Sequence, residues 1–394
     1  MASAEIIDLT AVSMADKIKS REISSVEVME AHLAQIEKIN PKVNAIVTLA
    51  PEEGLVAAKL ADEATARGGD LGPLHGLPVA HKDLVPTKGM LTTYGSPIYR
   101  DFVPDYSDLI VERMQAAGAI TIGKTNTPEF GAGAQTYNEV FGETLNPYDL
   151  SLTCGGSSGG SAVALACRMI PISDGSDTGG SLRNPANFCN VVGFRPSPVR
   201  VPVWPTLASW YPLSVQGPMA RTVEDVAYML SVIAGPDSRS PISIAEPGHT
   251  FNESLKRDFK NVPIAWSRDL GCLPVDPIVT EVIDSKRYIF DELGCNIIDA
   301  APDFSDADEV FKVWRAWIFE LSFGSLIDKH REQIKETVIW NIEEGQKLSG
   351  PQIGKAEIKR SEIYQRVREF MKHHEFLILP VNQVPPFDVK QPYV

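Results

Sequence analysis

The sequence predicts an α/β fold in which a central mixed, largely parallel sheet is covered on both faces by helices. Short apolar segments alternate with helix-compatible segments along the chain, a pattern typical of strands that helices connect. Hydrophobic residues make up 43% of the 394 residues and charged residues 22%, so the chain can bury an ordinary globular core. This length allows two or three average domains, or one large domain with insertions.

Residues 1–70 are expected to form a helical segment that packs on the core. Ser24 and Glu27 have the spacing of a capping box, in which each side chain satisfies a backbone N–H at the helix start. The helix that they begin should end near Pro41, and a second helix is expected over residues 52–67.

Residues 71–235 are expected to hold the central sheet. Apolar segments predict strands over residues 77–81, 119–123, 170–172 and 191–194. Helical patterns lie between or after them, over residues 107–117, 160–169 and 222–234.

The remainder, residues 236–394, begins with a loop rich in Pro, Ser, Gly and Asp that extends to residue 253. Strands are expected over residues 262–266 and 376–380, with a helix over 276–293. Residues 305–372 have few strand signals and are expected to form a helical insertion, interrupted at residues 349–351, that covers or shapes a cleft.

The composition argues against a nucleic-acid-binding, a disulfide-rich and a membrane-spanning protein. A net charge of −14 argues against a nucleic-acid surface, because phosphate binding requires clustered Lys and Arg. The five cysteines lack CxxC spacing, which indicates reduced thiols in a cytoplasmic protein and neither a disulfide framework nor a zinc site. We find no signal-peptide pattern and no apolar run long enough to span a membrane.

Two glycine-rich turns that carry serines are the most informative feature of the chain. They occupy residues 155–161 and 175–181, and an apolar, helix-compatible segment separates them. Glycines let backbone N–H groups approach a ligand, and a serine among such groups suits acyl transfer. Ser181 is the best candidate nucleophile. None of the seven histidines lies in a nucleophile-elbow context, which weakens a Ser-His-Asp triad although residue order alone does not exclude one. Lys82, at the end of a predicted strand, is the candidate base.

Five sequence blocks together resemble the amidase signature family of serine amidohydrolases. The resemblance is strong over residues 5–235 and weak from residue 236 onward. The blocks cover residues 76–83, 123–131, 155–161, 175–183 and 217–223.

The resemblance implies a Ser–cis-Ser–Lys triad at Ser181, Ser157 and Lys82. Ser181 would attack the amide carbonyl, and Ser157 would pass its proton to neutral Lys82 and then protonate the leaving amine. The peptide bond between Gly156 and Ser157 would be cis. The oxyanion would be held by the backbone amides of four successive residues, Thr178, Gly179, Gly180 and Ser181.

Several neighbouring residues have two possible roles. Ser158 either helps to hold the proton relay or caps the following helix. Arg183 is expected to form a structural ion pair, with Asp177 as its partner. The aromatic segment 203–212 either packs in the core or walls an apolar acyl or aryl pocket, and the pocket residues would be Trp204, Trp210 and Tyr211.

The sequence therefore predicts hydrolysis of a small-molecule carboxylic amide, without a metal or organic cofactor. Aryl amides, esters and carbamates undergo the same tetrahedral chemistry and stay open as substrates. Two alternatives also stay open: the A subunit of a tRNA-dependent glutamine amidotransferase, and a non-catalytic binding protein on the same scaffold. The resemblance implies a homodimer, and an additional C-terminal segment that we expect residues 236–394 to lack.

Overall fold

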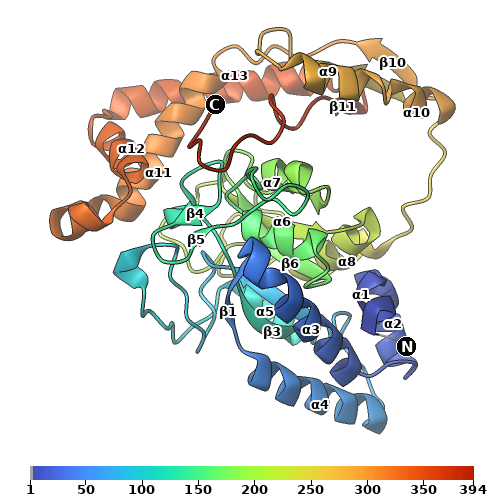
Figure 1. Cartoon of the computed structure of the whole chain (residues 1–394). Helices are drawn as coiled ribbons and strands as arrows, with labels where there is room; N and C mark the ends of the chain where they lie inside the picture. The colour runs from blue at the N-terminus through green and yellow to red at the C-terminus, as the bar shows by residue number, and fades with distance from the viewer. Residues whose placement is uncertain (1–2) are drawn as a thin grey trace. The chain divides into compact units, whose positions relative to one another are not determined.

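The computed structural model describes residues 3–394, which form two compact units (Figure 1). The first unit extends to Ser254 and includes Pro386–Val394. The second unit is Leu255–Pro385. In the described residues, no helix is both long enough and apolar enough to cross a membrane.

The first unit is built on a six-stranded mixed sheet. Its strand order is β1 (Ile46–Leu49), β3 (Ile120–Thr125), β2 (Pro78–Lys82), β6 (Ile172–Asp177), β8 (Val215–Ala220) and β7 (Val192–Gly193). The three central strands β3, β2 and β6 are parallel, and the outer pairings are antiparallel. The predicted mixed α/β fold is confirmed, with its parallel part at the centre of the sheet. A short hairpin of β4 (Tyr137–Asn138) and β5 (Gly142–Glu143) lies outside this sheet.

Helices cover both faces of the sheet. Successive residues of β2 point to opposite faces, so Val79 and Ala80 belong to two different apolar clusters. Helices α1, α2, α5 and α8 pack in the cluster of Val79, helices α4, α6 and α7 pack in that of Ala80, and α3 contributes to both. The bounds are α1 (Ser3–Asp8), α2 (Ala11–Lys19), α3 (Ser25–Val43), α4 (Pro51–Arg67), α5 (Leu109–Ala116), α6 (Gly159–Ala166), α7 (Arg183–Phe188) and α8 (Val223–Ile233). Three single 3₁₀ turns complete the unit, η1 (Pro97–Tyr99), η2 (Glu129–Gly131) and η3 (Gly248–Asn252).

The start of α3 confirms the predicted capping box. The Ser24 hydroxyl accepts a hydrogen bond from the Glu27 N–H, and the Glu27 carboxylate accepts one from the Ser24 N–H. The first 70 residues are not all helical, however, because β1 joins the edge of the sheet next to β3. The segment that forms β1 is only four residues long, too short for its period to separate strand from helix.

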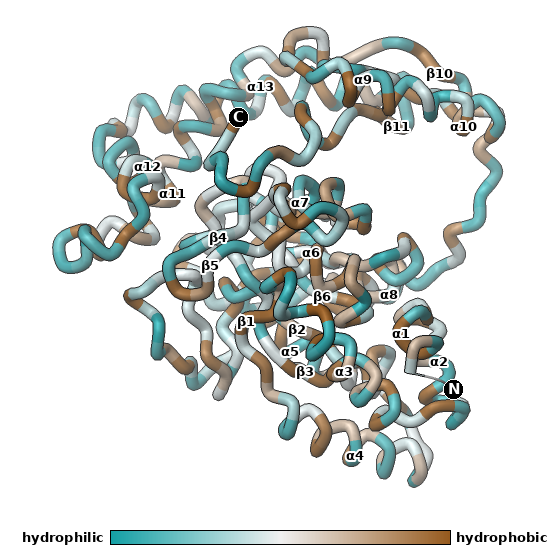
Figure 2. Tube along the Cα trace, in the orientation of Figure 1, coloured by the Kyte–Doolittle hydropathy of each residue, from teal (hydrophilic) through white to brown (hydrophobic). Residues whose placement is uncertain are grey.

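The second unit has its own parallel sheet, in the order β10 (Asn296–Asp299), β9 (Pro263–Trp266) and β11 (Phe376–Ile378). The helix predicted over residues 276–293 is divided into α9 (Pro277–Asp284) and α10 (Arg287–Glu292). The expected helical block contains α11 (Ala307–His330), the turn η4 (Arg331–Gln333), α12 (Glu336–Gln346) and α13 (Gly350–Phe370). Hydrophobic and hydrophilic residues alternate along α4 and α13, which fits helices with one face in solvent (Figure 2).

The units divide after Ser254, whereas the sequence suggested a division near residue 235. The loop that follows α8 stays with the first unit because η3 packs against that helix. Gly248 lies so close to α8 that a Cβ atom there would come within 2.4 Å of the Ser231 carbonyl oxygen. This close approach fixes the loop on the first unit.

Candidate active site

Lys82 is the last residue of β2, and its side chain is completely buried, with 0% exposure. The Nζ atom donates hydrogen bonds to three serine hydroxyls, at 2.7 Å from Ser157, 2.9 Å from Ser158 and 3.0 Å from Ser176. The amine therefore has polar partners but no carboxylate among them. The structure brings the predicted base and the predicted relay serine into direct contact.

Burial lowers the pKa of Lys82 to about 7, although the charges of Asp174 and Asp177 act in the opposite direction. A buried ammonium loses its hydration, and three neutral hydroxyls replace that hydration only in part. Near neutral pH a substantial fraction of the amine is therefore uncharged and can accept a proton.

The turn before α6 shapes the backbone around Ser157. The Gly156–Ser157 peptide bond is cis, as the family resemblance implied. A Cβ atom on Gly156 would come within 2.9 Å of the backbone of Gln135, so this position accepts only glycine without a backbone shift. The Gly156 N–H donates to the Asn184 side-chain oxygen at 3.1 Å, which connects this turn to α7.

Ser158 belongs to the hydrogen-bond network of the base. Its side chain makes no capping hydrogen bond, although the residue stands at the N-cap position of α6. Its hydroxyl accepts from Lys82 and from the Ser176 N–H, the latter at 3.3 Å. The structure therefore does not support the capping role, and a role in holding the relay stays a prediction.

Ser181 lies at the start of the turn into α7 and is half-buried. Its carbonyl oxygen accepts a hydrogen bond from the Ser158 N–H at 3.2 Å, so the two glycine-rich turns meet at this point. Within the described residues no hydrogen bond joins the hydroxyls of Ser157 and Ser181. The backbone of Ser181 therefore contacts the residue that follows Ser157, and the role of Ser181 as nucleophile stays a prediction.

One of the four predicted oxyanion amides already has a hydrogen-bond partner within the turn. The Gly180 N–H donates to the Asp177 Oδ1 atom at 2.9 Å, so this amide is already used inside the turn. Gly180 has φ +114°, a conformation that favours glycine, which explains its place in the turn independently of any ligand. The N–H groups of Thr178, Gly179 and Ser181 stay as candidates, since none of them donates a hydrogen bond within the described residues.

Asp177 organises this turn. Its carboxylate accepts from Arg183 and Arg195, each at 3.0 Å, and from the Leu182 N–H at 3.1 Å. Burial opposes its ionisation, but the hydrogen bonds and charges of the two arginines outweigh burial and lower the pKa of Asp177 to about 2. The expected Asp177–Arg183 ion pair is therefore present.

The aromatic segment lies at the surface of the first unit. Trp210 is 72% exposed, and the guanidinium of Arg239 covers the Trp204 ring at 4.7 Å from its centre. Tyr211 is half-buried. Arg195 ties the end of the segment to the Ser181 turn, because it donates to the Leu213 carbonyl at 2.8 Å as well as to Asp177. The pocket role of the three aromatic residues stays a prediction.

Three site residues were not singled out from the sequence. Ser176 lies in the second glycine-rich turn, but its contact with Lys82 depends on the pairing of β2 with β6. Arg195 and Asn184 carry no sequence signal of their own, and only the folded loops bring them to Asp177 and Gly156.

Comparison with known proteins identifies the family. The amidase family profile matches residues 27–393. The chain belongs to the amidase signature family. The enzymes of this family are hydrolases that act on amides.

Two relatives illustrate the range of similarity within the family. An acylamidase of Rhodococcus erythropolis is 34% identical over 388 residues, which cover 97% of this chain and 81% of that protein. The A subunit of the glutamyl-tRNA(Gln) amidotransferase of Geobacter metallireducens is 40% identical over 302 residues. That match covers 77% of this chain and 62% of the subunit.

A solved structure shows the same fold. A bacterial aryl acylamidase of the amidase signature family superposes with a TM-score of 0.90 at 27% identity. The superposition covers 96% of this chain and 81% of that one.

Proposed function

We propose that this protein cleaves carboxylic amides through a serine acyl-enzyme, with Ser181 as nucleophile, Ser157 as proton relay and Lys82 as base. The observation that carries the proposal is the 2.7 Å contact between the Lys82 amine and the Ser157 hydroxyl in a buried setting. A serine hydroxyl attacks a carbonyl only when a base takes its proton, and a lysine serves as that base only when it is uncharged.

In the first half-reaction the Ser181 Oγ atom bonds to the amide carbonyl carbon. The Ser181 proton moves to Ser157, whose own proton moves to Lys82 and gives an ammonium. The C–N bond then breaks, and the leaving nitrogen takes a proton from Ser157, which Lys82 replenishes. The products of this half are a free amine and an ester at Ser181.

Water completes the cycle by attacking the ester carbonyl. Its proton passes through Ser157 to Lys82, the ester C–O bond breaks, and Ser181 recovers its hydroxyl proton. The net reaction consumes one amide and one water and yields one carboxylic acid and one amine. The candidate amides of Thr178, Gly179 and Ser181 would stabilise the negative oxygen formed in each half.

The substrate class that we favour is a linear acyl amide, including aryl amides. The similarity to an acylamidase supports this class, because that match covers 97% of the chain, whereas the amidotransferase match covers 77%. The net charge of −14 also disfavours work beside tRNA. A glutamine amidotransferase A subunit is the alternative, and glutaminase activity with a co-purifying partner subunit would favour it.

A hydrolysis panel tests the proposal. It compares short aliphatic amides, anilides, glutamine, p-nitrophenyl esters and carbamates, with wild-type protein and the Ser181→Ala variant. We expect turnover of amides by the wild type, loss of turnover in the variant, and labelling of Ser181 by a fluorophosphonate. Ser361→Ala, which removes an exposed hydroxyl of α13, serves as the control. Full amide turnover by Ser181→Ala would exclude this nucleophile.

A further inference from the structure

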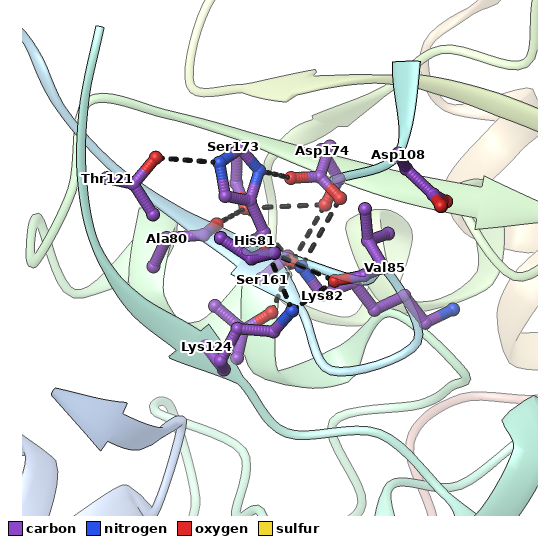
Figure 3. A network of polar contacts seen from close by, with 12 residues as sticks. Ala80, His81, Lys82, Val85, Asp108, Thr121, Lys124, Ser161, Ser173 and Asp174 are labelled. Carbon is purple, nitrogen blue, oxygen red and sulfur yellow. Dashed lines mark hydrogen bonds and ion pairs between the residues drawn. The ribbon is translucent and has the colours of Figure 1, made fainter. Parts of the chain in front are cut away.

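A second buried titratable group lies directly beside the proposed base. His81 precedes Lys82 on β2, and like Lys82 it has 0% exposure. Figure 3 shows the His81 ring between the side chains of Thr121 and Asp174, which belong to the two neighbouring strands. The Nδ1 atom lies 2.6 Å from the Asp174 Oδ1 atom on β6, and the Nε2 atom lies 3.1 Å from the Thr121 hydroxyl on β3.

Asp174 is held from two directions. Its Oδ1 atom pairs with the His81 ring, and its Oδ2 atom accepts the backbone N–H of Lys82 at 3.3 Å. The side-chain amine of Lys82 bonds instead to the three serine hydroxyls. The carboxylate is therefore bound to the backbone of the lysine but makes no hydrogen bond with its amine.

The other titratable groups near the base each have partners of their own. The carboxylate of Asp177 pairs with Arg183 and Arg195. That of Asp108 accepts from the Gln216 amide at 3.3 Å.

Two further titratable groups are Asp83, in the loop after β2, and Lys124, on β3. Asp83 accepts from the N–H and hydroxyl of Thr93. The Lys124 amine donates to the Val85 carbonyl and to the hydroxyls of Thr87 and Thr92. The side-chain partner of Asp174 within the described residues is thus His81.

The electrostatic consequence follows from burial. A buried carboxylate that loses its partner is strongly unfavourable, and a nearby amine gains free energy by becoming an ammonium beside it. An ammonium at position 82 cannot accept the proton from Ser157. We propose that His81 is a positioning residue for the base: its Nδ1–H holds the Asp174 carboxylate away from the Lys82 amine and so keeps that amine uncharged. This inference rests on the proposed function of Lys82.

The test measures the pH dependence of Ser181 labelling by a fluorophosphonate, which needs no knowledge of the substrate. In the wild type the labelling rate should rise with pH as Lys82 loses its proton. His81→Leu leaves Asp174 without its side-chain partner. The acidic limb of the curve of labelling rate against pH should therefore move to higher pH by about one unit. Asp174→Asn removes the negative charge, so the limb should move to lower pH by a similar amount.

Two further variants separate the hydrogen bond from a general disturbance of the core. His81→Asn keeps an N–H donor near the Nδ1 position and should restore most of the wild-type profile. In the double variant His81→Leu/Asp174→Asn the limb should coincide with that of Asp174→Asn, since the carboxylate is absent. His32→Asn is the matched control, because His32 is also fully buried and uses its Nδ1 atom, at 3.1 Å from the Arg168 carbonyl.

An unmoved acidic limb in both His81→Leu and Asp174→Asn would overturn the inference, as would shifts in the same direction. A shift in His81→Asn as large as in His81→Leu would overturn the hydrogen-bond explanation. If His81→Leu does not fold, Asp174→Asn decides alone, and an unchanged or higher limb contradicts the inference. Failure of the proposed function would look different: the wild type itself would show no labelling at Ser181.

Discussion

The amine of Lys82 lies 2.7 Å from the hydroxyl of Ser157, although 75 positions separate the two residues in the sequence. The contact forms because β2 pairs with β6, and α6, which begins two residues after Ser157, packs against both strands. Its chemical value comes from burial, since the same contact in water would involve a permanently charged ammonium.

Replacement of Lys82 by Met should strongly reduce catalysis. Met keeps the length and apolar stem of the side chain but cannot accept a proton, so kcat/KM for an anilide should fall by about 10²–10⁴-fold. In the wild type, kcat/KM should rise as pH increases through about 7, since burial lowers the pKa of Lys82 to that value. Lys88→Met, at an exposed position six residues later, should change neither quantity. Retained activity in Lys82→Met would contradict the assignment of the base.

The same variant should reveal what the buried amine costs in stability. The folded pKa of about 7 lies below the ordinary 10.5, so the unfolded chain binds more protons between these values. The wild-type free energy of unfolding should therefore rise with pH from about 7 to about 10, relative to Lys82→Met, by on the order of a few kcal/mol. Urea unfolding of both proteins at pH 7, 8 and 9 measures the difference. A constant difference across this range would show that Lys82 is charged in the folded protein.

Much of the fold could be predicted because local signals agree with the tertiary structure. The Ser24–Glu27 pair begins α3, and the apolar segment at residues 119–123 forms most of β3. The edge strand β1 was missed because a segment of four residues is too short for its hydrophobic pattern to distinguish a strand from a helix. The strand β8 was missed because Gln216, Gly217 and Pro218 break the usual strand composition.

The site could be predicted where residue type and sequence block coincide, as at Lys82 and Ser157. What could not be predicted depends on contacts between distant segments. The use of the Gly180 amide by Asp177, the contact of Ser176 with Lys82, and the link from Arg195 to Leu213 all arise only when the turns fold together.

The three serines around Lys82 should differ in importance. Ser157→Ala should lower kcat by about 10²–10⁴-fold, since this residue would carry the proton in both directions. Ser158→Ala and Ser176→Ala should each have a smaller effect, about tenfold or less, because each removes one of three hydrogen bonds to the amine. Single-turnover kinetics of ester and amide cleavage measure the three losses. Equal losses in all three variants would mean that none of the serines relays the proton.

The exposed Trp210 tests whether the aromatic segment contributes to substrate binding. If its ring walls an aryl pocket, Trp210→Ala should lower kcat/KM for an anilide far more than for acetamide, by about tenfold. The free energy of unfolding should change by less than about 0.5 kcal/mol, because the side chain is 72% exposed and buries little area. Steady-state kinetics on both amides measure the two losses in kcat/KM. An equal loss on the two substrates would exclude a pocket role.

Asp177 should make the free energy of unfolding depend on pH below about pH 4. Its folded pKa of about 2 lies below the ordinary 3.8, so the carboxylate stabilises the fold above about pH 4 and loses this effect as pH falls toward 2. The stability difference between wild type and Asp177→Asn should therefore shrink by about 2 kcal/mol between pH 5 and pH 2. Urea unfolding at both pH values measures it. Asp149→Asn, on an exposed turn, should show a much smaller change, and a pH-independent difference for Asp177→Asn would mean that the arginine pairing does not lower this pKa.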